Sequence, residues 1–203
     1  MKRKTGKSSI PFLDVSVFYV TIMKIVDIKT FKKLITTDNR FKYGRIASLD
    51  VGSKRIGVAC TDEIRFTINP VITLERKTPR MHPESIEKLS KQLQAIINEK
   101  NITGLVVGFP LTQENEITPL CKEIVTMCQR LSCHYKSPIP IPPTMQAEED
   151  LNLLCTFWDE RNSSVGSRAL SRSMSDKLSV AKKYKDTFAA CLILQGFVEN
   201  VLV

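Results

Sequence analysis

Four carboxylates occupy positions where acidic side chains are unexpected. Asp50 ends an apolar, strand-like run, and Asp159 and Glu160 end another. Asp186 begins the packing stripe of a closing amphipathic helix. Carboxylates that converge repel one another and are costly to desolvate unless a cation lies among them. A ligand set made only of oxygen suits Mg²⁺ or Mn²⁺, and two such ions ~4 Å apart can activate water for phosphodiester cleavage.

Each acid also has an ordinary structural interpretation. Asp50 could cap the turn that follows it, and Asp186 could be an acid at a helix N-terminus, stabilised by the helix dipole. Asp159 and Glu160 could form an exposed charge cluster with Arg161. These interpretations explain the acids one at a time, but they do not explain why all of them fall within one fold.

The elements that must position these acids alternate in type. Hydrophobic periodicity predicts strands at 45–50, 55–60, 66–74, 105–108 and 153–158, and helices at 25–37, 83–100, 117–131 and 186–202. From residue 45 onward the order is β-β-β-α-β-α-β-α. This order predicts an α/β fold with a mixed, five-stranded sheet flanked by helices. A proline-rich run at 137–143 predicts an extended surface loop.

Four motifs, in this order, resemble those of the YqgF/RuvX family. SLDVGSKRIGVA (48–59) is similar to the family's opening motif, and VVGFPL (106–111) to its G-x-P-L motif. WDER (158–161) resembles its D-E-R motif, and KDTFAACLILQ (185–195) its closing D-x-x-A-A-x-x-I-L-Q motif. The form looks closest to plant-type eukaryotic members. The resemblance implies an RNase H-like fold, dependence on Mg²⁺ or Mn²⁺, and hydrolysis of structured RNA or branched DNA, with rRNA precursor processing as the family's assigned bacterial role.

The resemblance also implies roles for the acids. Asp50, Glu160 and Asp186 become the catalytic, metal-binding carboxylates. Asp159 competes with Glu160 for this role, because neighbouring side chains at the end of a strand point in opposite directions. The residue types and the resemblance together predict a two-metal-ion nuclease.

Basic residues beside the acids are predicted to hold substrate phosphates. Arg161 follows Glu160 directly and would contact a phosphate, although an ion pair with Asp159 fits equally well. Four further candidates are Lys54, Arg55, Lys183 and Lys185. For each of them, an exposed basic position on a turn or loop is the alternative.

The positive charge is concentrated near the beginning of the chain. The formal net charge is +9, and residues 1–45 hold eleven basic and three acidic residues, against nineteen and eighteen in residues 46–203. We therefore divide the chain into a basic extension (1–44) and a nuclease domain (45–203) with a proline-rich insertion at about 137–152. The extension fits a phosphate-contacting arm, a mitochondrial or plastid targeting segment, or a solvated tail. Either Met1 or Met23 could be the true start.

The cysteines and the apolar runs restrict the setting of the protein. The six cysteines include no C-x-x-C pair and mostly fall in apolar runs, which favours buried thiols in a reducing, intracellular compartment. No apolar run approaches the length of a bilayer-spanning helix. The cytoplasm and an organelle both remain compatible with these features.

The expected partner is nucleic acid, with structured RNA favoured over branched DNA and pre-ribosomal particles as a further candidate. A dimeric Holliday junction resolvase stays open, because cutting a junction needs two symmetric sites; the oligomeric state, monomer or homodimer, is not readable from the sequence. A catalytically inactive nucleic-acid-binding or ribosome-assembly module is the non-enzyme alternative. An actin-like ATPase would need a second lobe, for which 203 residues leave no room.

Overall fold

The computed structural model describes residues 23–77, 80–114, 116–134, 153–160 and 178–202, with the backbone alone at 133–134 and 178–184. Residues 1–22, the predicted proline-rich insertion, Arg161 and the side chain of Lys183 therefore lie outside the described part of the chain.

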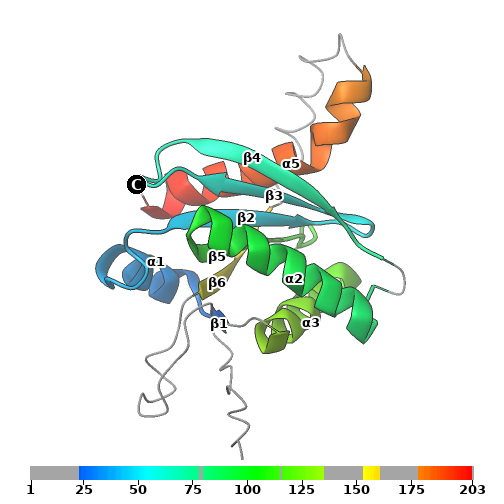
Figure 1. Cartoon of the computed structure of the whole chain (residues 1–203), viewed down its shortest axis with the longest axis horizontal. Helices are drawn as coiled ribbons and strands as arrows, with labels where there is room; N and C mark the ends of the chain where they lie inside the picture. Colours follow the sequence, from blue (N-terminus) through cyan, green and yellow to red (C-terminus); the bar gives the residue numbers. More distant parts are fainter. Residues whose placement is uncertain (1–22, 78–79, 115, 135–152, 161–177, 203) are drawn as a thin grey trace, which may run out of the picture.

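A mixed sheet forms the centre of the molecule (Figure 1). Its strands are β1 (Met23–Ile25), β2 (Arg45–Val51), β3 (Arg55–Thr61), β4 (Ile68–Glu75), β5 (Ile102–Phe109) and β6 (Leu153–Asp159), in the spatial order β1-β6-β5-β2-β3-β4. Strands β2, β3 and β4 form an antiparallel meander, whereas β5, β6 and β1 continue the sheet in parallel pairings. The predicted α/β fold with a mixed sheet is confirmed.

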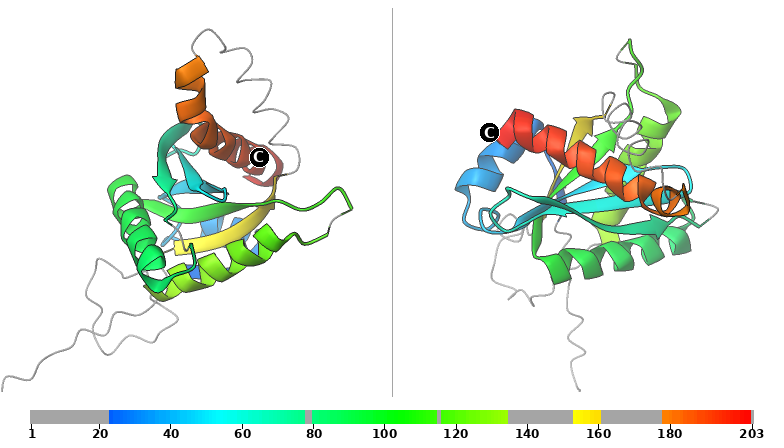
Figure 2. Two further views of the ribbon diagram at one scale, coloured as in Figure 1. Left: turned by 90° about the vertical axis from the view of Figure 1, so that its right-hand side faces the viewer. Right: turned by 90° about the horizontal axis from the view of Figure 1, so that it is seen from above.

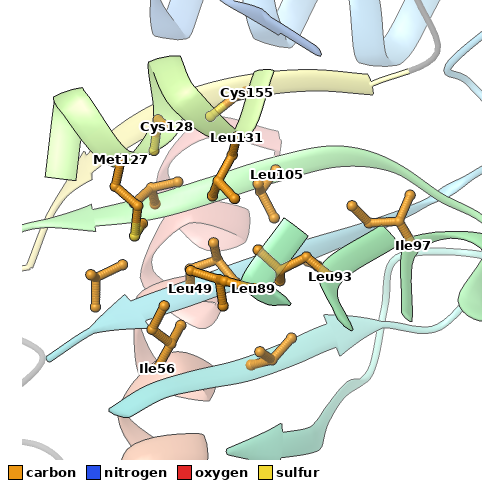
Figure 3. Packing of buried hydrophobic residues seen from close by; sticks show 14 of the residues in the cluster. Leu49, Ile56, Leu89, Leu93, Ile97, Leu105, Met127, Cys128, Leu131 and Cys155 are labelled. Atoms are coloured by element: carbon orange, nitrogen blue, oxygen red, sulfur yellow. The ribbon is translucent and has the colours of Figure 1, made fainter. Parts of the chain in front are cut away.

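Helices cover both faces of the sheet, as Figure 2 shows. On one face, α2 (Pro83–Lys100) and α3 (Pro119–His134) pack against the core that includes Leu49, Leu93 and Met127 (Figure 3). On the other face, α1 (Ile28–Thr37) and α5 (Leu178–Phe197) share a second core with β2, β5 and β6. A π-helical turn, Val198–Leu202, follows α5.

The N-terminal part of the fold differs from the prediction. The sequence predicts a helix from residue 25, but α1 begins at Ile28 because the Asp27 carboxylate caps it, accepting from the amides of Lys29 and Thr30 at 2.9 and 3.0 Å. Met23–Ile25 instead pairs with β6, so the sheet has a sixth strand rather than the five predicted. A three-residue strand is too short to show a period in sequence.

The closing helix also differs from the prediction. It is predicted to begin at Asp186 but begins at Leu178, so Asp186 lies more than two turns inside it. The interpretation of Asp186 as an acid at a helix N-terminus is therefore wrong. The predicted span of α2, residues 83–100, is confirmed, with Pro83 at its start and Asn101 in the left-handed conformation after its end.

Candidate active site

Asp50 lies near the end of β2, on the face of the sheet that α5 covers. Ser48, two residues earlier on the same face, donates a buried hydrogen bond of 2.7 Å from its hydroxyl to the carbonyl of Ala190 in α5. Ala190 is one helical turn beyond Asp186. This bond therefore holds α5 against β2 close to both Asp50 and Asp186.

Gly57 brings Asp186 close to Asp50. It is the antiparallel partner of Asp50 across β2 and β3. A Cβ atom at Gly57 would lie 1.9 Å from the backbone oxygen of Asp186 and 2.3 Å from its carbonyl carbon. Only glycine allows such contact between a strand and a helix backbone. The missing side chain thus lets α5 pass directly over β3 beside Asp50.

Gly108 makes the corresponding space for Glu160. Leu49 pairs with Val107, so the next residues along these parallel strands, Asp50 and Gly108, are side by side. A Cβ atom at Gly108 would lie 2.4 Å from Oε2 of Glu160. The Glu160 carboxylate therefore occupies the place that a side chain at Gly108 would fill, between β6 and Asp50.

The electrostatics confirm that these carboxyl groups are neighbours. Burial, together with the negative charge of Asp186, raises the pKa of Asp50 from 3.8 to about 6, although Lys185 partly offsets this. Burial raises the pKa of Glu160 from 4.5 to about 7, with Asp50 and Asp159 adding to the effect. Each acid is thus poorly solvated and repelled by the next one.

A basic side chain of the same site balances Asp186. Nε of Arg55, at the start of β3, lies 2.6 Å from Oδ2 of Asp186, in an ion pair that lacks hydrogen-bond geometry. Arg55 is 46% exposed and Asp186 is 21% exposed, so water can reach the pair from the side of Arg55. Arg55 is predicted to bind phosphate, but here it serves as the counter-ion of an acid.

The turn that carries Lys54 and Arg55 is held from beneath. The guanidinium of Arg76, only 2% exposed, donates to the carbonyl of Gly52 at 2.8 Å and pairs with Glu123 of α3 at 2.6 Å. The Lys54 side chain is exposed on this turn, and Lys185 is exposed on α5 next to Asp186. The side chains of both lysines are therefore open to solvent.

A divalent cation such as Mg²⁺ requires several oxygen donors at one point. Asp50 and Glu160 supply oxygen donors whose pKa values are raised by burial and by neighbouring negative charge, and Mg²⁺ or Mn²⁺ would favour their charged forms. Among the residues that the structure describes, however, no three His, Cys, Asp or Glu side chains form a ready ligand cluster. Asp186 would have to exchange Arg55 for the cation to complete the set. The oxygen donors of the acids thus fit a divalent cation, provided that the Asp186 carboxylate turns away from Arg55.

The structure brings together most of the residues that the sequence singles out. Asp50 lies within electrostatic range of both Asp186 and Glu160, and Asp159, at the end of β6, lies beside Glu160. Of these two neighbours, Glu160 is the one whose carboxylate reaches across Gly108.

Sequence reasoning assigned no role to Ser48, Gly57 or Gly108. The two glycines carry a signal that could have been used, because a glycine inside a strand marks a close approach by another group.

The two glycines predict different effects of an added methyl group. Gly57→Ala would place its Cβ against the α5 backbone, which cannot move without lifting the helix, so we expect a loss of ~2–3 kcal/mol in the free energy of unfolding. Gly108→Ala meets mainly side-chain atoms of Glu160 and Ile193, so we expect a smaller loss but a displaced Glu160. Chemical denaturation of both variants measures this, and equal stabilities would contradict the described packing.

The raised pKa values predict a pH-dependent stability. The folded protein holds the Asp50 and Glu160 protons to higher pH than the unfolded chain does, so these groups destabilise the fold as pH rises from about 4 through 7. In EDTA, Asp50→Asn should therefore be more stable than the wild type at pH 8, by on the order of 2 kcal/mol. The difference should shrink toward pH 4. Thermal melts across this range check it, and a constant difference would count against the shared burial of these acids.

Comparison with known proteins shows which family this chain resembles. The family model described as "RuvX: Holliday junction resolvase" matches residues 44–200. Two similar proteins, from Clostridioides difficile and Roseiflexus, are each described as "Putative pre-16S rRNA nuclease". The first is 30% identical over 156 residues, 77% of this chain and 94% of the relative. The second is 31% identical over 157 residues, 77% of this chain and 95% of the relative.

Two solved structures of Holliday junction resolvases are also similar. RuvC of Thermus thermophilus bound to a junction has a TM-score of 0.45 at 10% identity, covering 77% of this chain and 94% of that chain. The yeast mitochondrial resolvase has a TM-score of 0.42 at 12% identity, covering 83% of both chains. Because the family model matches residues 44–200, well over half of the chain, this chain belongs to the RuvX family.

Proposed function

We propose that this chain is a metal-dependent endonuclease that hydrolyses phosphodiester bonds in structured RNA. The observation that carries the proposal is the convergence of Asp50, Glu160 and Asp186 at the two in-strand glycines, in a chain of the RuvX family. Holding the partly desolvated carboxyl groups of Asp50 and Glu160 next to further acids opposes folding, so a protein that only binds RNA gains nothing from it.

Asp50, Glu160 and Asp186 would hold Mg²⁺ or Mn²⁺, with Asp159 as the neighbour that adds negative charge. When bound, one or two such ions supply a water-derived nucleophile and neutralise the charge on the leaving oxygen. Because the pKa of Glu160 is about 7, this carboxyl can hold or release a proton near neutral pH within the site.

Basic residues around the acids would position the substrate. Lys54 is exposed on the turn after β2 and Lys185 on α5 next to Asp186, and both would hold phosphates that flank the scissile bond. Arg55, once Asp186 turns to a cation, would be free to bind a phosphate in its turn. Arg161 and Lys183, which lie outside the described residues and side chains, are further candidates for the same role.

A precursor of the small-subunit rRNA is the substrate that we propose, since similar proteins carry that name and cover 77% of this chain. Cleavage of a Holliday junction is the second candidate, because the matching family model is described by that activity. A resolvase would act as a dimer with two symmetric sites, whereas cutting an RNA precursor needs only one.

Cleavage assays distinguish these functions. A labelled small-subunit rRNA precursor and a synthetic four-way junction are incubated with the protein in Mg²⁺, in Mn²⁺ and in EDTA. We expect metal-dependent cutting of the precursor, and a loss of at least about a hundredfold in rate in Asp50→Asn, because that variant removes a central ligand. The matched control is Glu99→Gln, which removes an exposed acid of α2 on the other face of the sheet.

The alternatives predict other outcomes in the same assay. Cutting of the junction alone, with light scattering showing a dimer, would assign the protein as a resolvase. Binding without cutting by either protein, in both metals, would contradict the catalytic proposal and favour an RNA-binding module.

A further inference from the structure

We propose a second RNA-contact surface at the end of the sheet opposite the acids. It binds unpaired nucleotides that flank, along the RNA chain, the bond to be cut. This surface, the distal patch, consists of Arg40, Lys42, Tyr43, Ile64 and Phe66. It rests on the proposed function in one respect only, namely that the ligand is RNA.

The distal patch exposes large apolar side chains that a folded domain would normally bury. Phe66 is 81% exposed, Ile64 is 82% exposed and Tyr43 is 67% exposed. Ile64 and Phe66 flank the tip of the turn between β3 and β4, and Tyr43 comes just before β2. Apolar groups gathered in this way on a surface mark an interaction site.

The turn that presents them is rigid. The Asp62 carboxylate accepts hydrogen bonds from the amides of Phe66 and Thr67, at 2.7 and 3.2 Å, and from the Thr67 hydroxyl at 2.7 Å. These bonds fix the backbone on both sides of the tip. Phe66 is therefore held in solvent by an ordered turn, which reduces the entropy lost when a ligand binds.

Arg65 ties the turn to the segment that carries Tyr43. Its guanidinium donates to the carbonyls of Ile35, Phe41 and Gly44, the last at 3.0 Å from Nε. Its φ of 61° is a left-handed conformation that non-glycine residues rarely adopt. This backbone cost is offset by the hydrogen bonds, which place the tip against the end of α1 and the loop that follows it.

The charge around the distal patch is positive. The ammonium of Lys42 lies 5.5 Å from the centroid of the Tyr43 ring, and the guanidinium of Arg40 lies over the Phe41 ring. The neighbouring α1 has exposed lysines at 29, 32 and 33 and no acidic residue. Among nearby acids, Asp38 pairs with Arg40 and Glu63 with Arg45, at 2.7 and 3.2 Å.

Aromatic side chains interleaved with cations favour RNA whose bases are unpaired. Every base can stack on an exposed ring, while the cations hold the backbone phosphates. A fully paired duplex hides its bases, so it would meet only the charges. The combination of rings and charge thus identifies single-stranded RNA as the ligand, rather than a duplex or an apolar protein surface.

The position of the distal patch gives it a role distinct from that of the acids. Strand β2 runs from Arg45, beside the patch, to Asp50, a span of roughly 17 Å. In Figure 1 the β3–β4 turn and α1 lie at one end of the sheet, and the β2–β3 turn at the other. Arg40, Lys42 and Tyr43 also precede residue 44, where the family match begins. The patch would therefore hold a strand that extends away from the site of cutting.

Binding of an unstructured RNA of about 12 nucleotides, followed by fluorescence anisotropy in EDTA, tests the proposal without any cleavage. The full-length Asp50→Asn protein serves as the background, so failure of the nuclease proposal leaves this test intact. We expect Tyr43→Ser with Phe66→Ser to weaken binding at least about tenfold, because two stacking surfaces are lost. Lys42→Gln should weaken it less, and less again at high salt.

Matched controls separate stacking from general effects. Ile72→Ser removes an apolar side chain, 44% exposed, outside the patch, and Lys88→Gln removes an exposed charge from α2 on the other face of the sheet. Both should bind like the background protein, and all variants should melt at the same temperature. An unchanged affinity in the double variant, or equal weakening in the Ile72 control, would overturn the proposal.

Crosslinking provides an independent readout. RNA containing 4-thiouridine, irradiated in complex with the background protein, should attach to peptides that contain Tyr43 or Phe66. Attachment only at the end of the sheet that carries Asp50 and Lys54 would overturn the distal patch. A perfect duplex of the same sequence is the control for unpaired bases. If the duplex binds as tightly as the single strand, and loses affinity equally in the double variant, unpaired bases are not the ligand of the distal patch.

Discussion

The close passage of α5 over the sheet is the constraint on which the rest of the site depends. It requires a strand position without a side chain, which Gly57 provides, and an anchor, which the hydrogen bond from Ser48 to Ala190 provides. Asp50 lies between these two contacts, two residues from Ser48 and paired with Gly57. The packing that buries α5 therefore also brings Asp186 close to Asp50. The contact between α5 and the sheet thus stabilises the fold and assembles the candidate site.

This arrangement has an electrostatic cost that the chain balances only in part. Arg55 pairs with Asp186, while burial and neighbouring negative charge raise the pKa values of Asp50 and Glu160. A divalent cation would favour the charged forms of these acids. The ion pair thus offsets part of the cost of holding Asp186 beside Asp50. Because of this ion pair, Asp186 could bind a cation only after it leaves Arg55.

Much of this structure could be predicted from the sequence, and the exceptions have physical reasons. The span of α2 and the mixed sheet follow from hydrophobic period and from caps, which are local signals. Strand β1 has too few residues to show a period, and its place beside β6 is a long-range pairing. Asp50, Asp159 and Glu160 were recognisable by their position at the ends of apolar runs, and Asp186 by its place on the packing stripe of the closing helix. Their partners were not, because the ion pair between Arg55 and Asp186 joins residues far apart in the chain.

The central claim is that the clustered acids are a site for a divalent cation, and calorimetric titration with Mn²⁺ at pH 7 tests it most directly. Performed in buffers of different ionisation enthalpy, the titration also counts protons. Because the pKa of Glu160 is about 7, binding should release a proton, and Glu160→Gln should remove this release and weaken affinity at least about tenfold. Absence of Mn²⁺ binding in the wild type, or the same affinity and proton count in Glu160→Gln, would contradict the account.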